Sequence, residues 1–320
     1  MIKVGIIGAA GYTAGELIRI LIHHPEVEVV LAQSESQSGK KVVEVHKDLI
    51  GETELVFSQE IDQRADVYFL CKGHGESRKL IDGNPELLGK KVIDLSQDFR
   101  LKGDHNFIYG LPEVNSEELA SAEHIANPGC FATCIQLGLL PAIGSEAVLG
   151  PISISGITGS TGAGQKLSPT SHFSWRSNNA SVYKALTHQH LLEISETFNG
   201  ISPSFDSKLL FVPYRGAFAR GIITTSHFET SLTEQQLVEV YQDSYKSAAF
   251  THVANSNPDL KQVVGTNKCL VYPRVIDGTA IIISVIDNLI KGASGQAVHN
   301  MNLLFGLPEK LGLNLKSTVF

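Results

Sequence analysis

Cys130 has the sequence surroundings of a nucleophile. It follows Asn-Pro-Gly and opens a run of helix-forming residues that we expect to end before Pro141. The free amides and the positive dipole end of a helix N-terminus favour thiolate, which is the reactive form of cysteine. The same amides can stabilise the oxyanion that a thiolate creates at a carbonyl. The alternative role, a small buried apolar residue, fits Cys71, Cys134 and Cys269.

A cysteine nucleophile needs a group that exchanges protons with it. The run "YKALTHQHLLEI" offers His188 and His190, with Tyr183 nearby. Either histidine could be the acid or base, and the other would then be a surface or interface residue. A metal site made of His-x-His and cysteine lacks a convincing further ligand, so no metal is expected.

A glycine-rich stretch lies close to the N-terminus. "GIIGAAGYTAGEL" places Gly8, Gly11 and Gly15 between a β-branched run and a helix expected at about 13–23. Glycines allow a tight turn and a close approach of backbone amides to a pyrophosphate at the helix N-terminus. A βα turn without a ligand is the alternative, but the strand–turn–helix context favours a dinucleotide site.

The residues after the second expected strand bear on the choice of dinucleotide. NAD-specific sites tend to carry an acidic residue there, bonded to the ribose 2′-hydroxyl. The run "AQSESQSGKK" offers Ser34, Ser36, Lys40 and Lys41, which suit a 2′-phosphate. Glu35 argues for NAD if it points inward. The sequence therefore favours NADP.

The elements that position these residues form two groups. Apolar strands at 2–8, 27–33, 65–71 and 91–96 alternate with helices, which predicts a parallel sheet covered on both faces. From about residue 150, longer and partly alternating strands and one helix at about 233–247 predict a mixed or antiparallel sheet. An amphipathic helix at about 294–305 is expected to return to the first domain. The predicted α/β fold thus has a Rossmann-type nucleotide domain (1–148 and 294–320) and an α+β catalytic and dimerisation domain (149–293).

Composition excludes several classes of function. The chain has 320 residues, 42% of them hydrophobic, and a net charge of −7, which gives no basic field for nucleic acid or anionic membranes. No apolar run approaches the ~20 residues of a membrane span. The best run, at 280–286, is expected to be a buried strand. Four cysteines without framework spacing and a poor signal-peptide pattern predict a cytoplasmic protein.

Several motifs together carry a resemblance to a known family. They occur in the order "GIIGAAGYTAGEL", "GHGES", "VIDLSQDFRL", "YGLPE", "NPGCFAT", "GSTGAG", "HQHLLEI" and "IDNLIKGASGQAVHNMN". This order resembles the N-acetyl-γ-glutamyl-phosphate reductase family of arginine biosynthesis over nearly the whole chain. The resemblance implies the two-domain fold of semialdehyde dehydrogenases, NADPH as the cofactor, and reduction of an acyl phosphate to a semialdehyde. It also implies a homodimer or homotetramer acting on a small molecule.

The resemblance assigns roles to individual residues. It makes Cys130 the nucleophile that forms a thioester, and His188 its acid or base. The residues that it implies for the cofactor are Gly8, Gly11, Tyr12, Thr13, Ala14, His74, Gly75, Ser77, Ser96 and Asn288, and they join Ser34 and Ser36, which are expected from the sequence after the second strand. The residues expected to bind substrate are Asn127, Gln165, His190, Arg215 and Arg220.

The chain departs from the family pattern where substrate should bind. The common "GAGR" is "GAGQ" here, which replaces an arginine by Gln165, and "FVPYRGAFARGI" adds Arg215. A neighbouring loop adds Arg176. Because arginines that bind anions bidentately are not freely exchangeable, we hypothesise a different N-acyl group, such as succinyl, with Arg215 or Arg176 as its partner. Drift, with Lys166 or Arg176 replacing the lost charge, is the alternative.

Two other functions remain open on the sequence. One is a related reductase of N-acyl-aminoadipyl or carrier-linked phosphates in lysine biosynthesis. An acidic carrier would need a basic docking face, which a net charge of −7 does not favour. The other is a non-catalytic NADP-binding sensor, which would tolerate loss of Cys130 and His188.

Overall fold

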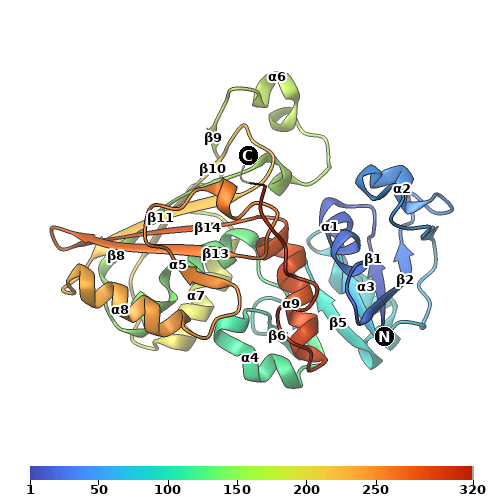
Figure 1. Cartoon of the computed structure of the whole chain (residues 1–320), viewed down its shortest axis with the longest axis horizontal. Helices are drawn as coiled ribbons and strands as arrows, with labels where there is room; N and C mark the ends of the chain where they lie inside the picture. The colour runs from blue at the N-terminus through green and yellow to red at the C-terminus, as the bar shows by residue number, and fades with distance from the viewer. Residues whose placement is uncertain (319–320) are drawn as a thin grey trace. The chain divides into compact units, whose positions relative to one another are not determined.

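The structure is a computed structural model that describes residues 1–318. It divides into two compact units: unit 1 contains Met1–Gly129 and Ala293–Asn314, and unit 2 contains Cys130–Gly292 and the last described residues (Figure 1). The sequence pattern predicted a domain boundary between residues 148 and 149, whereas the boundary between the two units lies between residues 129 and 130. The difference arises because the helix that starts at Cys130 packs on the sheet of unit 2.

Unit 1 contains a seven-stranded parallel sheet within the described residues, in the order β3-β2-β1-β4-β5-β7-β6. The strands are β1 (Ile2–Ile7), β2 (Val27–Gln33), β3 (Phe57–Ser58), β4 (Val67–Leu70), β5 (Lys91–Asp94), β6 (Phe107–Tyr109) and β7 (His124–Ala126). The parallel sheet predicted from the short apolar runs is confirmed. Strands β3, β6 and β7 were not predicted, because two or three residues carry no readable periodicity.

Unit 1 has the helices α1 (Tyr12–Leu21), α2 (Val42–Val45), α3 (Glu76–Gly83), α4 (Pro112–Ser121) and α9 (Gly295–Leu304) within the described residues. The first four lie between its strands along the chain, whereas α9 comes after all the strands of unit 2. The expectation that α9 is amphipathic is wrong, because its polar residues are buried with the apolar ones. Gln296 and Asn300 each donate a 3.0 Å hydrogen bond to the carbonyl of Gly110, so burial leaves these amide donors partnered.

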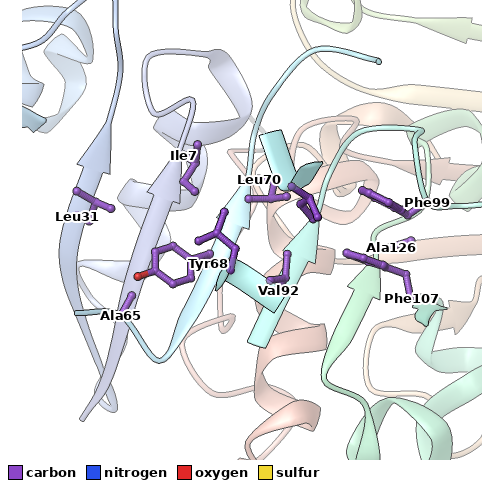
Figure 2. Close-up of a cluster of buried hydrophobic side chains, with 11 residues drawn as sticks. Ile7, Leu31, Ala65, Tyr68, Leu70, Val92, Phe99, Phe107 and Ala126 are labelled. Atoms are coloured by element: carbon purple, nitrogen blue, oxygen red, sulfur yellow. The ribbon is translucent and has the colours of Figure 1, made fainter. Parts of the chain in front are cut away.

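One face of the parallel sheet carries a hydrophobic cluster (Figure 2). Its members come from six neighbouring strands and from the segments next to them: Ile7, Leu31, Ala65, Tyr68, Leu70, Ile81, Leu87, Val92, Phe99, Phe107 and Ala126. Phe99 and Phe107 stack with ring centroids 4.1 Å apart. This cluster fixes the sheet whose carboxyl edge carries the candidate cofactor residues.

Unit 2 contains a seven-stranded mixed sheet within the described residues, in the order β12-β13-β14-β11-β8-β10-β9. The strands are β8 (Leu149–Thr158), β9 (Ser181–Val182), β10 (Leu209–Arg215), β11 (Ile222–Glu229), β12 (Thr251–Val253), β13 (Cys269–Ile276) and β14 (Thr279–Ile286). Strand β10 runs parallel to β8, and β12 runs parallel to β13, while the other pairs are antiparallel. The mixed sheet and the strand expected at 280–286 are confirmed.

The helices of unit 2 are α5 (Cys130–Gly144), α6 (Phe173–Arg176), α7 (His190–Ile201) and α8 (Glu234–Tyr245). Helix α5 lies against β11 and β14 and contacts α7 and α8. Short 3₁₀ turns occur at Lys47–Leu49, Pro85–Gly89, Ser160–Ala163, Pro169–Ser171 and Leu260–Gln262, and a π-helical turn spans Ile290–Ser294. Across residues 1–318, no helix has the length and apolarity needed to span a membrane.

Helix α5 begins at Cys130 as predicted, but the expected end before Pro141 is wrong. The helix continues to Gly144 through the proline. Proline removes the N–H that would bond to the carbonyl of Leu137, four residues earlier. The hydroxyl of Tyr245 donates a 2.6 Å hydrogen bond to that carbonyl instead, and Tyr241 donates one of 2.6 Å to Gly138. Helix α8 thus satisfies the backbone groups that the proline disturbs.

Candidate active site

The glycine turn of unit 1 lies after the central strand β1. Gly8 has a φ of +83°, and a Cβ there would lie 2.7 Å from the carbonyl oxygen of Cys71, which follows β4. Both features require glycine. The strand order reverses between β1 and β4, which is where ligands bind in open parallel sheets.

The N-terminus of α1 suits a phosphate. Its N-cap is Gly11, which offers no side-chain cap, and its first turn carries no acidic residue. Tyr12 is exposed, Ala14 is buried, and the carbonyl of Thr13 accepts a 2.7 Å hydrogen bond from Ser294. Since nothing negative competes there, the turn fits the pyrophosphate of a dinucleotide.

The residues after β2 divide into buried and exposed groups. Ser34 is buried, whereas Ser36 is exposed. The carboxylate of Glu35 forms a 3.1 Å ion pair with Lys72. Because Lys72 offsets the charge of Glu35, this carboxylate repels a 2′-phosphate less than an unpaired carboxylate would.

The loops after β4 and β5 are joined by hydrogen bonds. The N–H of Gly75, the N-cap of α3, donates to Asp98 Oδ1 over 2.6 Å. The N–H of Gln97 donates to Nδ1 of His74 over 3.2 Å. His74 and Gly75 therefore lie beside the segment from Ser96 to Arg100. Residues that contribute to one cofactor site must lie close together in this way.

Two serines of the cofactor set surround a buried carboxyl group. The hydroxyl of Ser96 donates to Asp94 Oδ2 over 2.7 Å. Burial raises the pKa of Asp94, and the hydrogen bond from the Ser96 hydroxyl acts against that rise. Ser77 and Ser96 are both buried, so they lie inside the unit and not at its surface.

Asn127 also lies in unit 1, and its side chain is engaged there. Its Nδ2 donates to the carbonyl of Ala293 over 3.1 Å, and its Oδ1 accepts a 3.1 Å hydrogen bond from Asn300. Its backbone carbonyl accepts a 2.9 Å hydrogen bond from Arg100. These bonds fix the chain just before the Pro-Gly turn that leads to Cys130.

Cys130 occupies the first position of α5 in unit 2. A Cβ built on Gly292 would lie 2.8 Å from the Cβ of Cys130, so glycine allows the π-helical turn to pass beside the thiol. Cys130 is partly exposed, whereas Cys134 and Cys269 are buried, and all the cysteines are free thiols. Burial raises the pKa of the Cys134 thiol to about 11, which leaves it inert at neutral pH.

His188 lies among aromatic rings. Its ring is 5.7 Å from that of Phe131, the residue after Cys130, and 5.4 Å from that of Phe211. Its Nδ1 accepts a 3.2 Å hydrogen bond from the backbone N–H of His190. Burial, with the positive charges of Lys184 and Arg215, lowers the pKa of His188 to about 4.

His190 begins α7 and lies within 3.9 Å (Nε2 to Oε1) of the buried Glu193. The rings of His188 and His190 are 4.6 Å apart. The structure thus brings both candidate histidines to one cluster, and His188 is the one whose ring packs against Phe131.

Arg215 lies at the end of β10 in the same cluster. Its guanidinium carbon is 4.6 Å from the ring centroid of Tyr183, and that ring is 5.8 Å from His188. Burial raises the pKa of Tyr183 to about 12; the charge of Cys130 adds to the rise, and Arg215 opposes it. Within residues 1–318, the Nε of Arg215 has no hydrogen-bond partner although it is buried.

The segment that carries Tyr183 and His188 has an unusual backbone. Lys184 and Leu186 have φ values of +45° and +58°, a left-handed conformation that non-glycine residues rarely adopt. Hydrogen bonds from Tyr183 N–H to Pro213 and from Leu186 N–H to Phe211 hold the segment on β10. Such strain persists where the surrounding contacts over-determine the conformation.

Arg220 and Asn288 belong to a second network in unit 2. Arg220 forms hydrogen bonds of 3.1 Å to both carboxylate oxygens of the buried Asp287. Asn288 accepts a 2.7 Å hydrogen bond from Gly221 N–H and donates one of 3.0 Å to Thr161. The network ties the end of β14 to the loop after β8.

The loop between β8 and β9 carries Gln165, Lys166 and Arg176, which differ in exposure. Gln165 and Lys166 are exposed. Arg176 is buried, and its guanidinium donates to the carbonyls of Thr170, Asn179 and Arg215, the last over 2.6 Å. Arg176 therefore holds the loop and the end of β10, and this leaves Arg215 as the better placed partner for an anion.

Sequence reasoning did not single out Asp287 or Gly292. Asp287 accepts hydrogen bonds from Arg220, Gly265, Leu289 and Ile290. An acidic residue directly after a buried apolar strand was the available signal. Among residues 1–318, no group of three or more His, Cys, Asp or Glu side chains is arranged to hold a metal ion.

Comparison with known proteins agrees with the division of the chain into two units. The sequence profile of the semialdehyde dehydrogenase NAD-binding domain matches residues 3–122, and that of the semialdehyde dehydrogenase dimerisation domain matches residues 130–288. Among solved structures, aspartate semialdehyde dehydrogenase II from Vibrio cholerae has a TM-score of 0.76 at 20% identity, covering 96% of this chain and 99% of that one. Aspartate semialdehyde dehydrogenase with NADP from Candida albicans has a TM-score of 0.72 at 16% identity, covering 95% and 99%. At these identities the likeness shows the fold.

Curated relatives match over their whole length. N-acetyl-gamma-glutamyl-phosphate reductases from Parabacteroides distasonis, Bacteroides thetaiotaomicron and Christiangramia forsetii are 51%, 52% and 50% identical to this chain, covering 100% of each sequence. Identity at this level over the full length exceeds what a shared fold alone produces. The chain therefore belongs to the N-acetyl-gamma-glutamyl-phosphate reductase family.

Proposed function

We propose that this protein uses NADPH to reduce an N-acyl-γ-glutamyl phosphate to the corresponding semialdehyde, in arginine biosynthesis. The observation that carries the proposal is the position of Cys130 at the start of α5, with His188 packed on the adjacent Phe131. A partly exposed thiol at a helix N-terminus beside an imidazole is the arrangement of an activated nucleophile.

The chemistry follows from these groups. The Cys130 thiolate attacks the γ-carbonyl carbon, a carbon–sulfur bond forms, and phosphate leaves with the carbon–oxygen electron pair to give a thioester. The nicotinamide, when bound, supplies the hydride that reduces this carbonyl carbon. Amides at the start of α5 and the ring of His188 supply hydrogen bonds to the carbonyl oxygen as negative charge develops. The carbon–sulfur bond then breaks, which releases the aldehyde and restores the thiolate.

The proposed cofactor residues lie at the carboxyl edge of the parallel sheet. The Gly8 turn and the uncapped N-terminus of α1 would hold the pyrophosphate, with Gly11 to Ala14 supplying backbone contacts. Ser34 and Ser36 would face the adenosine ribose and its 2′-phosphate. His74, Gly75, Ser77 and Ser96 would shape the neighbouring loops. Asn288, in unit 2, is the proposed contact near the nicotinamide.

The N-acyl group is a separate question. Arg215 has a buried Nε without a partner among the described residues, whereas Arg176 is engaged by carbonyl groups. This supports Arg215 as the partner of a carboxylate-bearing acyl group such as succinyl. Arg220, His190, Asn127 and Gln165 complete the proposed substrate set. Turnover of N-acetyl- and N-succinyl-glutamyl phosphate tests the idea, and equal or better use of the acetyl substrate contradicts it.

The principal test is NADPH oxidation in the presence of the acyl phosphate. We expect turnover by the native chain and loss of at least about 10³-fold in kcat for Cys130→Ala, because the covalent route is removed. Cys134→Ala, which removes a buried thiol of the same helix, is the matched control and should retain most activity. Unchanged turnover by Cys130→Ala would sink the proposal.

Two further proposals concern the cellular location and the oligomeric state of the protein. We infer a cytoplasmic enzyme, since its free thiols and biosynthetic relatives fit a reducing compartment. We infer a homodimer or homotetramer formed through unit 2, because the dimerisation-domain profile covers residues 130–288. Light scattering of the purified chain measures this directly.

A further inference from the structure

We propose that His46 is a positioning residue for the cofactor, because it holds the glycine turn after β1 with a backbone N–H directed toward the pyrophosphate of NADPH. The inference rests on the proposed function for the identity of the cofactor. It goes beyond that function by naming a buried residue that acts on the cofactor only through the backbone of the turn.

His46 lies in the segment between β2 and β3, directly after α2. Its side chain is 8% exposed. Its Nε2 donates a 2.8 Å hydrogen bond to the backbone carbonyl of Ala9, in the glycine turn. Because a carbonyl oxygen can only accept, the Nε2 atom carries a proton in this arrangement. The imidazole therefore acts on the turn as a fixed donor.

The ring of His46 reaches the turn across Gly15, near the start of α1. A Cβ built on Gly15 would lie 2.6 Å from the Nδ1 and 2.8 Å from the Cε1 of His46. Because glycine has no Cβ, the ring can lie against the helix backbone at this point. The glycine pattern of the sequence thus includes one position that admits the imidazole.

The Ala9 residue is held by hydrogen bonds on both sides. Its N–H donates to the carbonyl of Gln33, at the end of β2, over 2.8 Å, and its carbonyl accepts from His46. A trans peptide points its N–H opposite to its C=O, so the N–H of Ala10 points away from His46. Among residues 1–318, neither a carbonyl nor a side chain accepts a hydrogen bond from this N–H.

The direction of this peptide decides what the turn offers to an anion. The N–H of Ala10 comes directly before Gly11, the N-cap of α1, and so adds one donor to those of the helix N-terminus. Without His46 the Ala9 carbonyl would be buried without a donor, which favours rotation of the peptide. Rotation would turn a carbonyl toward the phosphate in place of an N–H. His46 therefore keeps a donor on the side of the cofactor.

Packing of the segment between β2 and β3 is the alternative role of His46. Its ring lies 6.2 Å from the ring of Phe57, on β3. The same segment carries Ser34 and Ser36, which are proposed to face the 2′-phosphate. A packing role would therefore affect NADPH, which carries that phosphate, more than NADH. Orientation of the Ala9 carbonyl would affect both cofactors equally, because both contain the pyrophosphate.

The test is cofactor binding without substrate, measured by titrating nicotinamide fluorescence. For His46→Leu we expect the Kd for NADPH and that for NADH to rise by the same factor, about tenfold, as for the loss of one buried hydrogen bond. His46→Gln should stay within about threefold of the native Kd, because its amide nitrogen can donate to the Ala9 carbonyl. The rate at which iodoacetamide alkylates Cys130 should be unchanged in both variants.

Gly15→Ala tests the same contact while keeping the histidine. Its methyl group must displace the imidazole, so we expect the Kd for both cofactors to rise about tenfold here as well. This variant provides the measurement if His46→Leu does not fold. Unchanged Kd values in Gly15→Ala would show that the ring does not hold the turn.

The matched control is His124→Leu, which removes a histidine that is 2% exposed on β7 of the same sheet. Its ring nitrogens bond to Asn106 and to the carbonyl of Leu88, so we expect a lower melting temperature and an unchanged Kd. An equal rise of the Kd in His124→Leu overturns the proposal, because the effect would then be general destabilisation.

Three further results overturn it: a native Kd in His46→Leu, no recovery in His46→Gln, or a rise for NADPH alone. A native chain that binds NADPH without reducing the acyl phosphate contradicts the proposed function, and the titrations still decide the role of His46. A native chain that binds neither cofactor contradicts both.

Discussion

Gly292 and Cys130 approach each other so closely that only glycine fits. A Cβ on Gly292 would lie 2.8 Å from the Cβ of Cys130 and 3.3 Å from its Cα. Gly292 belongs to the π-helical turn that follows β14, and such turns are frequent at functional sites. The turn thus sets the position of the nucleophile from outside its own helix.

Gly292→Ala should therefore impair catalysis more than folding. The added methyl group must displace either the turn or Cys130, and we expect kcat to fall at least about 10²-fold, as small misplacements of reacting groups do. Steady-state kinetics and thermal unfolding measure the two effects. Gly200→Ala, in α7 with no atom within 4 Å of the new Cβ, is the control and should be neutral or slightly stabilising. Normal kcat in Gly292→Ala would contradict the close contact.

The contact between α5 and α8 predicts coupling between Pro141 and Tyr245. Tyr245→Phe should reduce the free energy of unfolding by about 1–2 kcal/mol, because the carbonyl of Leu137 loses its buried partner. In a Pro141→Ala background the backbone N–H of residue 141 can bond to that carbonyl, so Tyr245→Phe should cost less. Urea denaturation of the four variants in this double-mutant cycle measures the coupling. Equal costs in both backgrounds would show that the tyrosine does not replace the missing bond.

The lowered pKa of His188 predicts an acid-sensitive fold. Above pH 6.5 the ring is neutral in both folded and unfolded chains. Between pH 6.5 and its folded pKa of about 4, the unfolded chain binds a proton that the folded chain does not, so stability is lost as pH falls. In His188→Gln this contribution is absent. Between pH 7 and pH 5 the free energy of unfolding should therefore fall less in the variant than in the native chain, by up to about 2 kcal/mol. Parallel urea denaturation curves at the two pH values check this, and identical losses in both proteins would argue against a depressed pKa.

The ion pair between Lys72 and Glu35 predicts a contribution to cofactor choice. Lys72→Met should raise the KM for NADPH more than that for NADH, because Glu35 would then repel the 2′-phosphate. Lys79→Met breaks an ion pair with Glu76 in the same unit and provides the control. Parallel changes in the two KM values would place Glu35 away from the phosphate.

The sequence predicted the elements with strong periodicity and missed those without local signals. Strands β1, β2, β4, β5 and β14 are continuous or alternating apolar runs, and each was expected close to its observed position. Helix α7 was missed because its N-cap, Gln189, has helical dihedral angles and no capping side chain, so the usual start signal is absent. The end of α5 was misplaced because the partners that satisfy the helix around Pro141 come from α8.

The candidate site, like the fold, was predicted only where local sequence signals exist. Cys130, the histidine pair and the Gly8 turn were recognisable from residue type and neighbours along the chain. The stacking of Arg215 on Tyr183 was not, because it depends on the pairing of β9 with β10, which no local pattern encodes. The engagement of Arg176 by carbonyl groups was hidden for the same reason.

The covalent role of Cys130 is tested most directly by trapping the acyl-enzyme. The chain is mixed with N-acetyl- or N-succinyl-glutamyl phosphate in the absence of NADPH, quenched in acid and analysed by peptide mass spectrometry. We predict one acyl group on the peptide that contains Cys130, released as aldehyde when NADPH is added before the quench, and no adduct in Cys130→Ala. Steady turnover of the same substrate by a chain whose Cys130 never becomes acylated would contradict this account.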